Sequence, residues 1–252
     1  MDGISRLAVE EIIVTTASEV DVGELYALSP AVSSVTLNGN VVGAGGIDIR
    51  RLRDVRHLAL EWEAVSRTGL PPGPALESLT LLGYDAKELP DLGGRLRSLA
   101  LYGAKNLVDL EGLRAMDNLR ELEINDARRL TDIDALAALR DLVRFEADGC
   151  TGIHELEVLR DARNLRRLRL ADCGGIASLA PIRGHNQLQA LLAWGTTNIE
   201  DGDLTPLLSL PRLSELALKS RRHYSPSVSS IERARGSRRR GPTLDGDAQA
   251  ET

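Results

Sequence analysis

Aromatic residues are scarce in this sequence: they make up 3% of its 252 residues, with one Phe, two Trp and four Tyr. A core built on aromatic rings is therefore excluded, and aliphatic side chains must supply most of the buried surface. Cysteine is scarce too. Two cysteines cannot form a disulfide framework, and no HExxH or CxxC motif accompanies the four histidines. We therefore expect no metal and no cofactor.

Long apolar runs are also missing. No stretch of about 18 apolar residues occurs, as a membrane-spanning helix would need. The first residues, Met1 to Arg6, lack the basic region and apolar stretch of a secretory signal. These absences predict a protein without a membrane span, located in the cytoplasm.

Lysine is nearly absent, with Lys87, Lys105 and Lys219 the only lysines among 31 basic residues. This arginine bias is typical of codon usage in a GC-rich genome. The charge is also unevenly placed: residues 1–218 carry a formal net charge of −10 and residues 219–252 one of +4. An acidic body argues against nucleic-acid binding, for which Arg238 to Arg240 are the only support.

Apolar residues recur in one pattern along most of the chain. In the segment from Leu119 to Ile124 they occupy the first, fourth and sixth places, and the same triplet returns at steps of 20 to 25 residues. The ten triplets start at Val9, Val32, Val55, Leu76, Leu96, Leu119, Leu142, Leu165, Leu188 and Leu213. Ten units over roughly residues 7–220 predict a repeat protein, because one unit cannot bury its own leucines and stacked units can.

Each triplet predicts a short β-strand. The fourth and sixth residues are two apart and point to the core, whereas the third and fifth point to solvent. Strands of successive units should lie parallel, about 4.8 Å apart. Several units continue with apolar residues three apart, as in Leu107, Leu110 and Leu113, which predicts a short helical or 3₁₀ turn on the outer side. Side chains suited to cap such turns precede them at Asp109, Asp132, Glu155 and Ser178.

With this LxxLxL strand motif the chain resembles the leucine-rich-repeat superfamily. The resemblance implies an α/β fold: a right-handed solenoid with a concave parallel β-sheet and short helical or 3₁₀ turns on the convex side. The family's asparagine at the ninth place appears only as Asn40. Most other units have a small residue there, as in the cysteine-containing branch, and Tyr84 and Arg221 are exceptions. Cys150 and Cys173 would then stack at about 5 Å, close enough for a disulfide. A reducing compartment favours buried thiols instead.

Two segments are expected along the chain. Residues 1–225 should form the solenoid, with about ten repeats and irregular end caps. Residues 226–252, rich in Arg, Ser and Gly with almost no apolar residue, should form a disordered tail. Turn-rich inserts lie at 41–46 and 71–74; the first lacks the GxGxxG and Lys-Ser/Thr patterns of a phosphate-binding loop, so a flexible turn is predicted. Pro90, in a unit of 20 residues, favours an extended outer segment.

The solvent-facing side chains of the strands are the predicted binding surface, because they have no role in the core and form one continuous concave sheet. Early strands contribute small or weakly polar residues, the middle strands carry charges of both signs, and an apolar pair follows. The candidate partner-binding residues are Tyr102, Glu121, Glu123, Arg144, Glu146, Asp148, Arg167, Arg169, Leu192 and Trp194.

Two interpretations of these side chains remain open. The charges can pair across strands and be structural. Against this, Glu123 is expected beside Glu146, and Arg144 beside Arg167, which is unfavourable unless diagonal partners or a ligand compensate. The apolar pair next to arginine is typical of interface hot spots if it is exposed, and buried if the carboxy-terminal cap folds over it.

The predicted function is a non-catalytic protein-interaction module that binds one macromolecular partner through the concave sheet, as a monomeric inhibitor, immunity or scaffold protein. The alternative is a hydrolase-type enzyme that uses the carboxylates of Glu123 and Glu146 with His57 or His154. This alternative is disfavoured because His154 falls outside the sheet and His57 lies three strands from Glu123. A shallow sheet also excludes water poorly.

Overall fold

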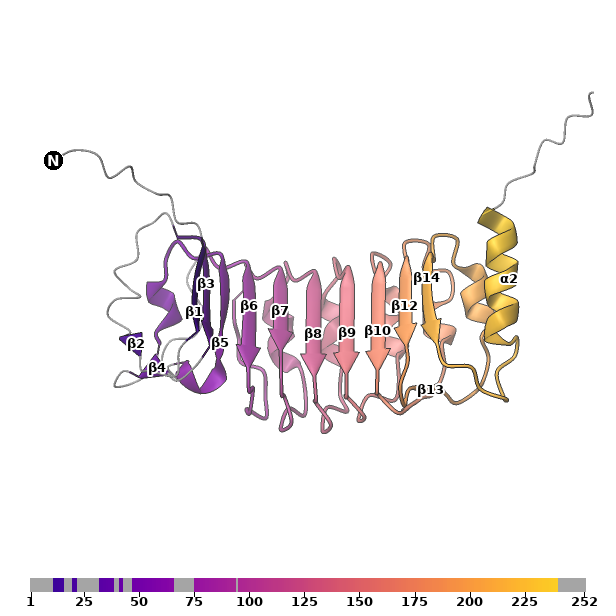
Figure 1. The fold of residues 1–252 in the computed structure, drawn as a ribbon, viewed down its shortest axis with the longest axis horizontal. Helices are drawn as coiled ribbons and strands as arrows, with labels where there is room; N and C mark the ends of the chain where they lie inside the picture. The colour runs from indigo at the N-terminus through magenta and orange to yellow at the C-terminus, as the bar shows by residue number, and fades with distance from the viewer. Residues whose placement is uncertain are drawn as a thin grey trace, which may run out of the picture.

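The computed structural model describes residues 11–15, 20–21, 32–38, 41–42, 47–65, 75–93 and 95–239. Their main feature is a parallel sheet of ten strands that follow one another in chain order (Figure 1). The strands are β1 (Glu11–Thr15), β3 (Ser34–Asn38), β5 (His57–Glu61), β6 (Ser78–Leu82), β7 (Ser98–Leu101), β8 (Glu121–Asn125), β9 (Arg144–Asp148), β10 (Arg167–Ala171), β12 (Ala190–Ala193) and β14 (Glu215–Leu218). Each strand coincides with one of the ten predicted triplets, so the repeat and the parallel sheet are confirmed.

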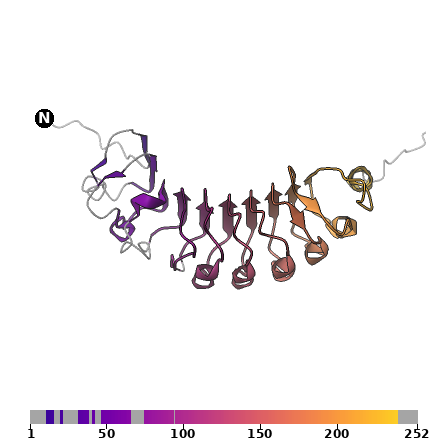
Figure 2. The same ribbon diagram turned by 90° about the horizontal axis from the view of Figure 1, so that it is seen from below.

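Short 3₁₀ turns cover the outer side of the sheet. Figure 2 shows the strands along the inner side of a shallow arc and the turns along its outer side. The 3₁₀ turns are η1 (Ile49–Arg51), η3 (Glu111–Ala115), η4 (Asp134–Ala138), η5 (Glu157–Asp161), η6 (Ala180–Ile182) and η7 (Thr205–Ser209), whereas η2 (Trp62–Ala64) follows directly on β5 at the end of that strand. Between β6 and β7 the described residues form no helical turn, which confirms the extended segment predicted around Pro90.

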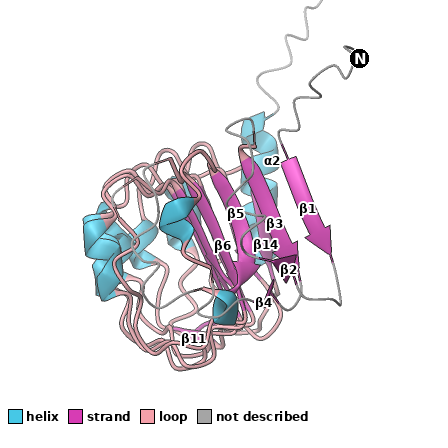
Figure 3. Cartoon of the chain, turned by 90° about the vertical axis from the view of Figure 1, so that its left-hand side faces the viewer, coloured by secondary structure: helices cyan, strands magenta, loops and turns pink. Residues whose placement is uncertain are grey.

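Two further pairs of short strands lie outside the large sheet. They are β2 (Val20–Asp21) with β4 (Val41–Val42), and β11 (Gly175–Ile176) with β13 (Asn198–Ile199). Figure 3 looks along the stacked units and shows the sheet on one side, the helical turns on the other and loops joining them. Each unit is therefore one turn of a solenoid, with its strand on the concave side.

Polar side chains begin the outer turns as predicted at three of four positions. The side chains of Asp109, Asp132 and Ser178 accept a hydrogen bond from the backbone N–H two residues further on, at 3.1, 2.9 and 3.0 Å. Within the described chain no such bond is found for Glu155. These polar residues satisfy donors that a turn's own backbone leaves unpaired, so their role is structural.

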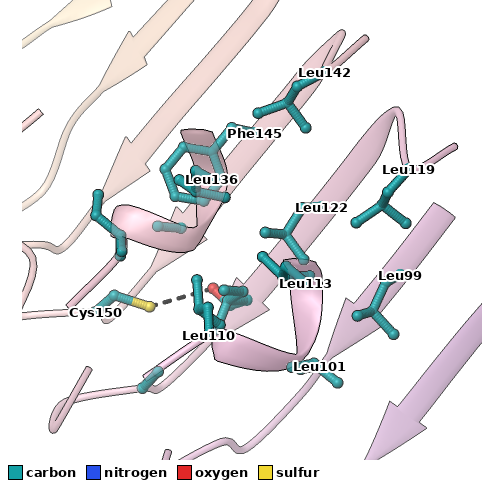
Figure 4. Close-up of a cluster of buried hydrophobic side chains, with 14 of the residues drawn as sticks. Leu99, Leu101, Leu110, Leu113, Leu119, Leu122, Leu136, Leu142, Phe145 and Cys150 are labelled. Carbon is teal, nitrogen blue, oxygen red and sulfur yellow. Dashed lines mark hydrogen bonds between the residues drawn. The ribbon is translucent and has the colours of Figure 1, made fainter. Parts of the chain in front are cut away.

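The core fills the space between the sheet and the outer turns. Figure 4 shows leucines of neighbouring units in this space, with Leu122 from β8 beside Leu113 of η3 and Phe145 from β9 beside Leu136 of η4. The inward residues of the middle strands, such as Leu122 and Phe145, are 0% exposed. Aliphatic side chains thus supply nearly all of the burial, as the composition predicts.

The two cysteines are part of this core. Both are free and buried, and the Cys150 thiol donates a hydrogen bond to the carbonyl oxygen of Ile124 at 3.3 Å (Figure 4). Burial raises the pKa of Cys150 to about 11 and that of Cys173 to about 12. The structure therefore contains a ladder of buried thiols and no disulfide between them.

Just after several middle strands, one residue has its backbone in the left-handed conformation. At the eighth place of the unit, Gly103, Gly149 and Gly195 have φ of 69°, 66° and 67°, while Asp126 and Asp172 have 60° and 50°. Glycine adopts this conformation without strain, and aspartate tolerates it better than most residues. In one case the carboxylate also gains a bond, since Oδ1 of Asp172 accepts the backbone N–H of Thr196 at 2.9 Å.

The carboxy-terminal region differs from the prediction. Part of the segment expected to be disordered, 226–252, forms the helix α2 (Val228–Arg239), at the right-hand end in Figure 1. Val228 and Ile231 are 7% and 0% exposed, and the guanidinium of Arg235 donates to the carbonyl oxygens of Leu207 and Leu210 at 3.3 Å. The low apolar content was misleading because a few well-placed side chains suffice to cover the last core layer of a solenoid.

Other predictions fall largely outside the described residues. These include residues 43–46 and 71–74 of the turn-rich inserts, and residues 240–252 of the tail. In the part of the chain that the structure describes, no helix is both long and apolar enough to cross a membrane.

Candidate functional site

The ten candidate residues all lie on the concave side of the sheet. They come from five neighbouring units, from Tyr102 directly after β7 to Trp194 directly after β12. The alternation of strand side chains puts them there: in β8 and β10 the third and fifth places are partly exposed and the intervening residues are buried. The alternation of inward and outward side chains along each strand therefore places every candidate on the predicted face.

Glu146 on β9 is the centre of the charged network. Arg167 Nε on β10 donates a hydrogen bond to its Oε1 at 2.8 Å, Arg169 Nη1 lies 3.6 Å from Oε2, and Arg144 Nε lies 3.8 Å from Oε1. The residue is only 8% exposed. Three guanidinium groups thus compensate one nearly buried carboxylate, as a carboxylate removed from water requires.

The expected like-charge neighbours are present in the register. Glu123 is paired with Glu146, and Arg144 with Arg167. Opposite charges offset this repulsion, since Arg167 reaches Glu146 diagonally and Arg144 lies 3.8 Å from Glu121, its direct register partner on the other side. The charges are therefore structural in part, which is the first of the two interpretations that the sequence left open.

Tyr102 and Glu123 form a second contact on this face. The Tyr102 hydroxyl donates a hydrogen bond to Oε1 of Glu123 at 2.9 Å. Burial raises the pKa of Tyr102 to about 12, and the bond to Glu123 adds to the shift. The phenol therefore stays protonated at neutral pH and serves as a fixed donor to a carboxylate.

Arg169 connects the charges to the aromatic end of the face. Its Nη2 donates to Asp148 at 2.5 Å, and its guanidinium carbon lies 5.0 Å from the centre of the Trp194 ring. Burial raises the pKa of Asp148, and the charge of Arg169 opposes that shift. The Nε atom of Arg169 is buried without a hydrogen-bond partner among the described residues. Trp194, 37% exposed, is held against this arginine by a cation–π contact.

The expectation that Leu192 is exposed is wrong. Leu192 is 2% exposed although its place in β12 faces the concave side. Arg169 lies directly beside it in the register, and the side chain of Arg169 extends to Trp194, two residues further along the chain. Leu192 thus lies between the strand that carries Arg169 and the strand β14. Of the apolar pair, Trp194 alone offers a large exposed surface.

Two further residues of the same face, Glu215 and Ile13, are not among the ten candidates. Glu215 on β14 accepts a salt bridge from Arg167 at 3.0 Å. Because Arg167 and Glu215 flank Ala190 from opposite sides in the register, their ion pair spans β12. Ile13 on β1 is 61% exposed. Both occupy outward places of the repeat, so extending the same parity rule to the end units would have found them.

Neither His57 nor His154 lies beside the concave carboxylates of Glu123 and Glu146. His57 on β5 is three strands from Glu123 on β8, about 14 Å at the usual strand spacing. His154 lies outside the sheet, where its Nδ1 is 2.6 Å from the Gly175 carbonyl oxygen and its Nε2 is 3.4 Å from Glu200. Among the described residues, no group of three or more His, Cys, Asp or Glu side chains could hold a metal ion.

Comparison with known proteins supports the architecture. No family model and no curated protein matches the sequence. An internalin, InlF, from Listeria monocytogenes is similar in structure, with a TM-score of 0.55 and 17% identity over 80% of this chain and 71% of the internalin. The leucine-rich-repeat domain of the type III effector XopL gives a TM-score of 0.52 and 17% identity over 83% of this chain and 76% of that domain. At such identity the likeness concerns the fold, and by that fold this chain is a leucine-rich-repeat solenoid.

Proposed function

We propose that the chain is a non-catalytic protein-interaction module that binds one protein partner through the concave face. The binding surface consists of the exposed parts of the charged network and of Trp194, with Leu192 as a buried support. A leucine-rich-repeat fold favours this class of function in general, because its sheet presents one long surface of side chains that the core does not need.

The exposed ring of Trp194 is the observation that carries the proposal. A tryptophan has a large apolar surface, and tryptophan and arginine are enriched among the residues that contribute most to protein–protein binding. Its contact with Arg169 holds the ring in one orientation. A ring held in place loses little conformational freedom on binding, so it can serve as an anchor surrounded by charged residues.

The charges around the anchor would select the partner. They include five carboxylates, those of Glu121, Glu123, Glu146, Asp148 and Glu215, against three arginines, Arg144, Arg167 and Arg169. The surplus of negative charge favours a partner with a basic surface, since complementary charge speeds association and excludes competitors. Action as a monomeric inhibitor, immunity or scaffold protein in a bacterial cytoplasm fits this surface and remains part of the proposal.

The test compares three forms of the full chain as bait in a bacterial lysate. The wild type and Val108→Ala, a control with the same 37% exposure as Trp194 but no place in the strands of the sheet, should retain the same protein. Trp194→Ala should lose it. With the purified partner, Trp194→Ala should weaken binding about 30-fold, equivalent to about 2 kcal/mol for a hot-spot tryptophan.

Thermal unfolding of the Trp194→Ala variant should stay within about 2 °C of the wild type, because an exposed ring contributes little to the core. Two results would refute the proposal. One is equal partner binding by Trp194→Ala and the wild type. The other is loss of binding on deletion of residues 240–252 alone, which would assign recognition to the end of the chain and not to the concave face.

A further inference from the structure

A second surface feature lies apart from the concave candidates. A cavity of about 490 Å³ opens along the edge where the chain leads into strands β5 to β8. We call it the arginine cavity. It is lined by Arg56, Ala75, Glu77, Arg95, Arg97 and Asn118. None of them belongs to the ten candidates, and all of them precede the strands by one to three residues. The arginine cavity is therefore independent of the proposed partner-binding surface.

The cavity arises at an irregular point of the repeat. The place just before the first apolar residue of a unit is taken by Asn164 and Arg212 in later units, and there the side chain bonds back to the preceding unit. Asn164 Nδ2 donates to the Arg140 carbonyl oxygen at 3.1 Å, and Arg212 bonds to Gln187. At the same place Ala75 has only a methyl group, which cannot span the gap between units. The space that other units fill therefore stays open here.

Positive charge dominates the lining. Three of the six residues are arginines and one is acidic, which gives a formal charge of +2 in a chain whose total is −6. Arg120 continues the row, since its backbone N–H donates to the Arg97 carbonyl oxygen at 2.8 Å from the next unit. Such an island of positive charge on an acidic protein attracts anions selectively.

The carboxylate of Glu77 lies between two of the guanidinium groups and contacts both. Its Oε1 accepts from Arg56 Nη1 at 3.2 Å, and its Oε2 lies 3.9 Å from Arg97 Nε. One carboxylate cannot neutralise three guanidinium groups. The side chains of Arg56 and Arg97 are also 61% and 62% exposed, so they can donate further hydrogen bonds to a molecule in the cavity.

We infer that the arginine cavity binds a compact polyanion, a small ligand bearing phosphate or carboxylate groups. The planar fork of N–H donors in arginine matches the oxygen pairs of both groups and binds them through charge-assisted hydrogen bonds. The volume lies within the range of small-molecule sites, about 300–1,000 Å³. No lining residue is aromatic or a large apolar one, so the surface has no apolar wall for an acyl chain.

The binding test uses inorganic pyrophosphate and citrate as probes, titrated into the full chain by isothermal calorimetry at low ionic strength. Saturable binding of either probe at one site per chain is expected, and the tighter of the two identifies the anionic group. Absence of saturable binding by both probes would overturn the inference.

Matched variants locate the site. The double variant Arg95→Gln with Arg97→Gln should weaken binding at least tenfold. The control, Arg212→Gln with Arg166→Gln, changes arginines at the same two places of later repeats, outside the cavity, and should change affinity less than twofold. If both double variants lost affinity for the probe equally, the anion would be attracted to arginine in general. That result would overturn the assignment of the site to the cavity. Thermal unfolding of both variants should match the wild type, because these side chains are exposed.

A third variant tests the charge argument. Glu77→Gln raises the formal charge of the lining from +2 to +3 and releases Arg56 and Arg97 for the ligand. It should tighten binding about threefold at low ionic strength, and the gain should shrink as salt is added. Weaker binding by Glu77→Gln would contradict the electrostatic basis of the site.

Discussion

Replacing Glu146 by Gln is expected to destabilise the protein although Glu146 lies on a solvent-facing side of the sheet. The substitution keeps the shape of the side chain and removes its charge. Arg144, Arg167 and Arg169 then lose a shared carboxylate that lies 2.8 to 3.8 Å from them. Their mutual repulsion is no longer offset at the centre of the network.

The magnitude follows from burial. An exposed ion pair contributes about 0–1 kcal/mol, and breaking a buried one costs about 3–5 kcal/mol. The Glu146 side chain is 10% exposed while those of its three arginines are 25% to 44% exposed, so the site lies between these limits. We expect a loss of about 2 kcal/mol in the free energy of unfolding. For a protein of this size that corresponds to a fall of about 4–8 °C in Tm.

Urea titration followed by far-UV circular dichroism measures this loss, with Glu121→Gln as the matched control. Glu121 lies on the same face, but its side chain is 42% exposed and its carboxylate is 3.8 Å from Arg144. Its replacement should cost less than about 0.5 kcal/mol. If both variants lost equal stability, or if Glu146→Gln were neutral, the reasoning that burial sets the value of the network would be refuted.

Three further changes test the core and the ends of the solenoid. Leu168→Ala, at a position that is 0% exposed, should cost about 2–5 kcal/mol in urea titration because it leaves a cavity between stacked units, whereas exposed Arg166→Ala should cost less than about 0.5 kcal/mol. Burial lowers the pKa of His185 below its usual 6.5, so the unfolded chain takes up a proton first as pH falls. The free energy of unfolding should therefore decline from about pH 7 to 5.5, and the His185→Gln variant should lack that part of the decline. If the variant had the same pH profile as the wild type, His185 would not be the cause. Deleting residues 226–252 exposes the core layer under α2 and should cost about 3–5 kcal/mol, whereas deletion of 240–252 should leave thermal unfolding unchanged.

The sequence alone was sufficient to predict the ten-stranded sheet of this protein. The LxxLxL triplet has a period of two, so it specifies both where each strand lies and which side chains face the core. A step of about 23 residues brings each strand beside the previous one, and this sets the register without any long-range choice. The parity of places therefore predicted the concave positions of Glu123, Arg144 and Trp194 before any contact was known.

Three of the four capping predictions and the thiol prediction succeeded for the same reason. Asp109 and Asp132 act on backbone groups two residues away, and Cys150 occupies an inward place of its unit. Such features depend on the local conformation of one unit, which the repeat already specifies.

Only the tertiary structure decided how far side chains reach between units. Arg167 spans β12 to Glu215, and Arg169 reaches Trp194 beside Leu192, so an outward leucine becomes buried. Helix α2 forms although its sequence looks disordered, because Val228 and Ile231 find the open end of the core. The arginine cavity likewise depends on what Ala75 fails to fill between neighbouring units. The repeat length and the alternation of inward and outward side chains are properties of one unit. The burial of an outward leucine, the capping of the solenoid end and the cavity arise instead from contacts between side chains that are distant in sequence.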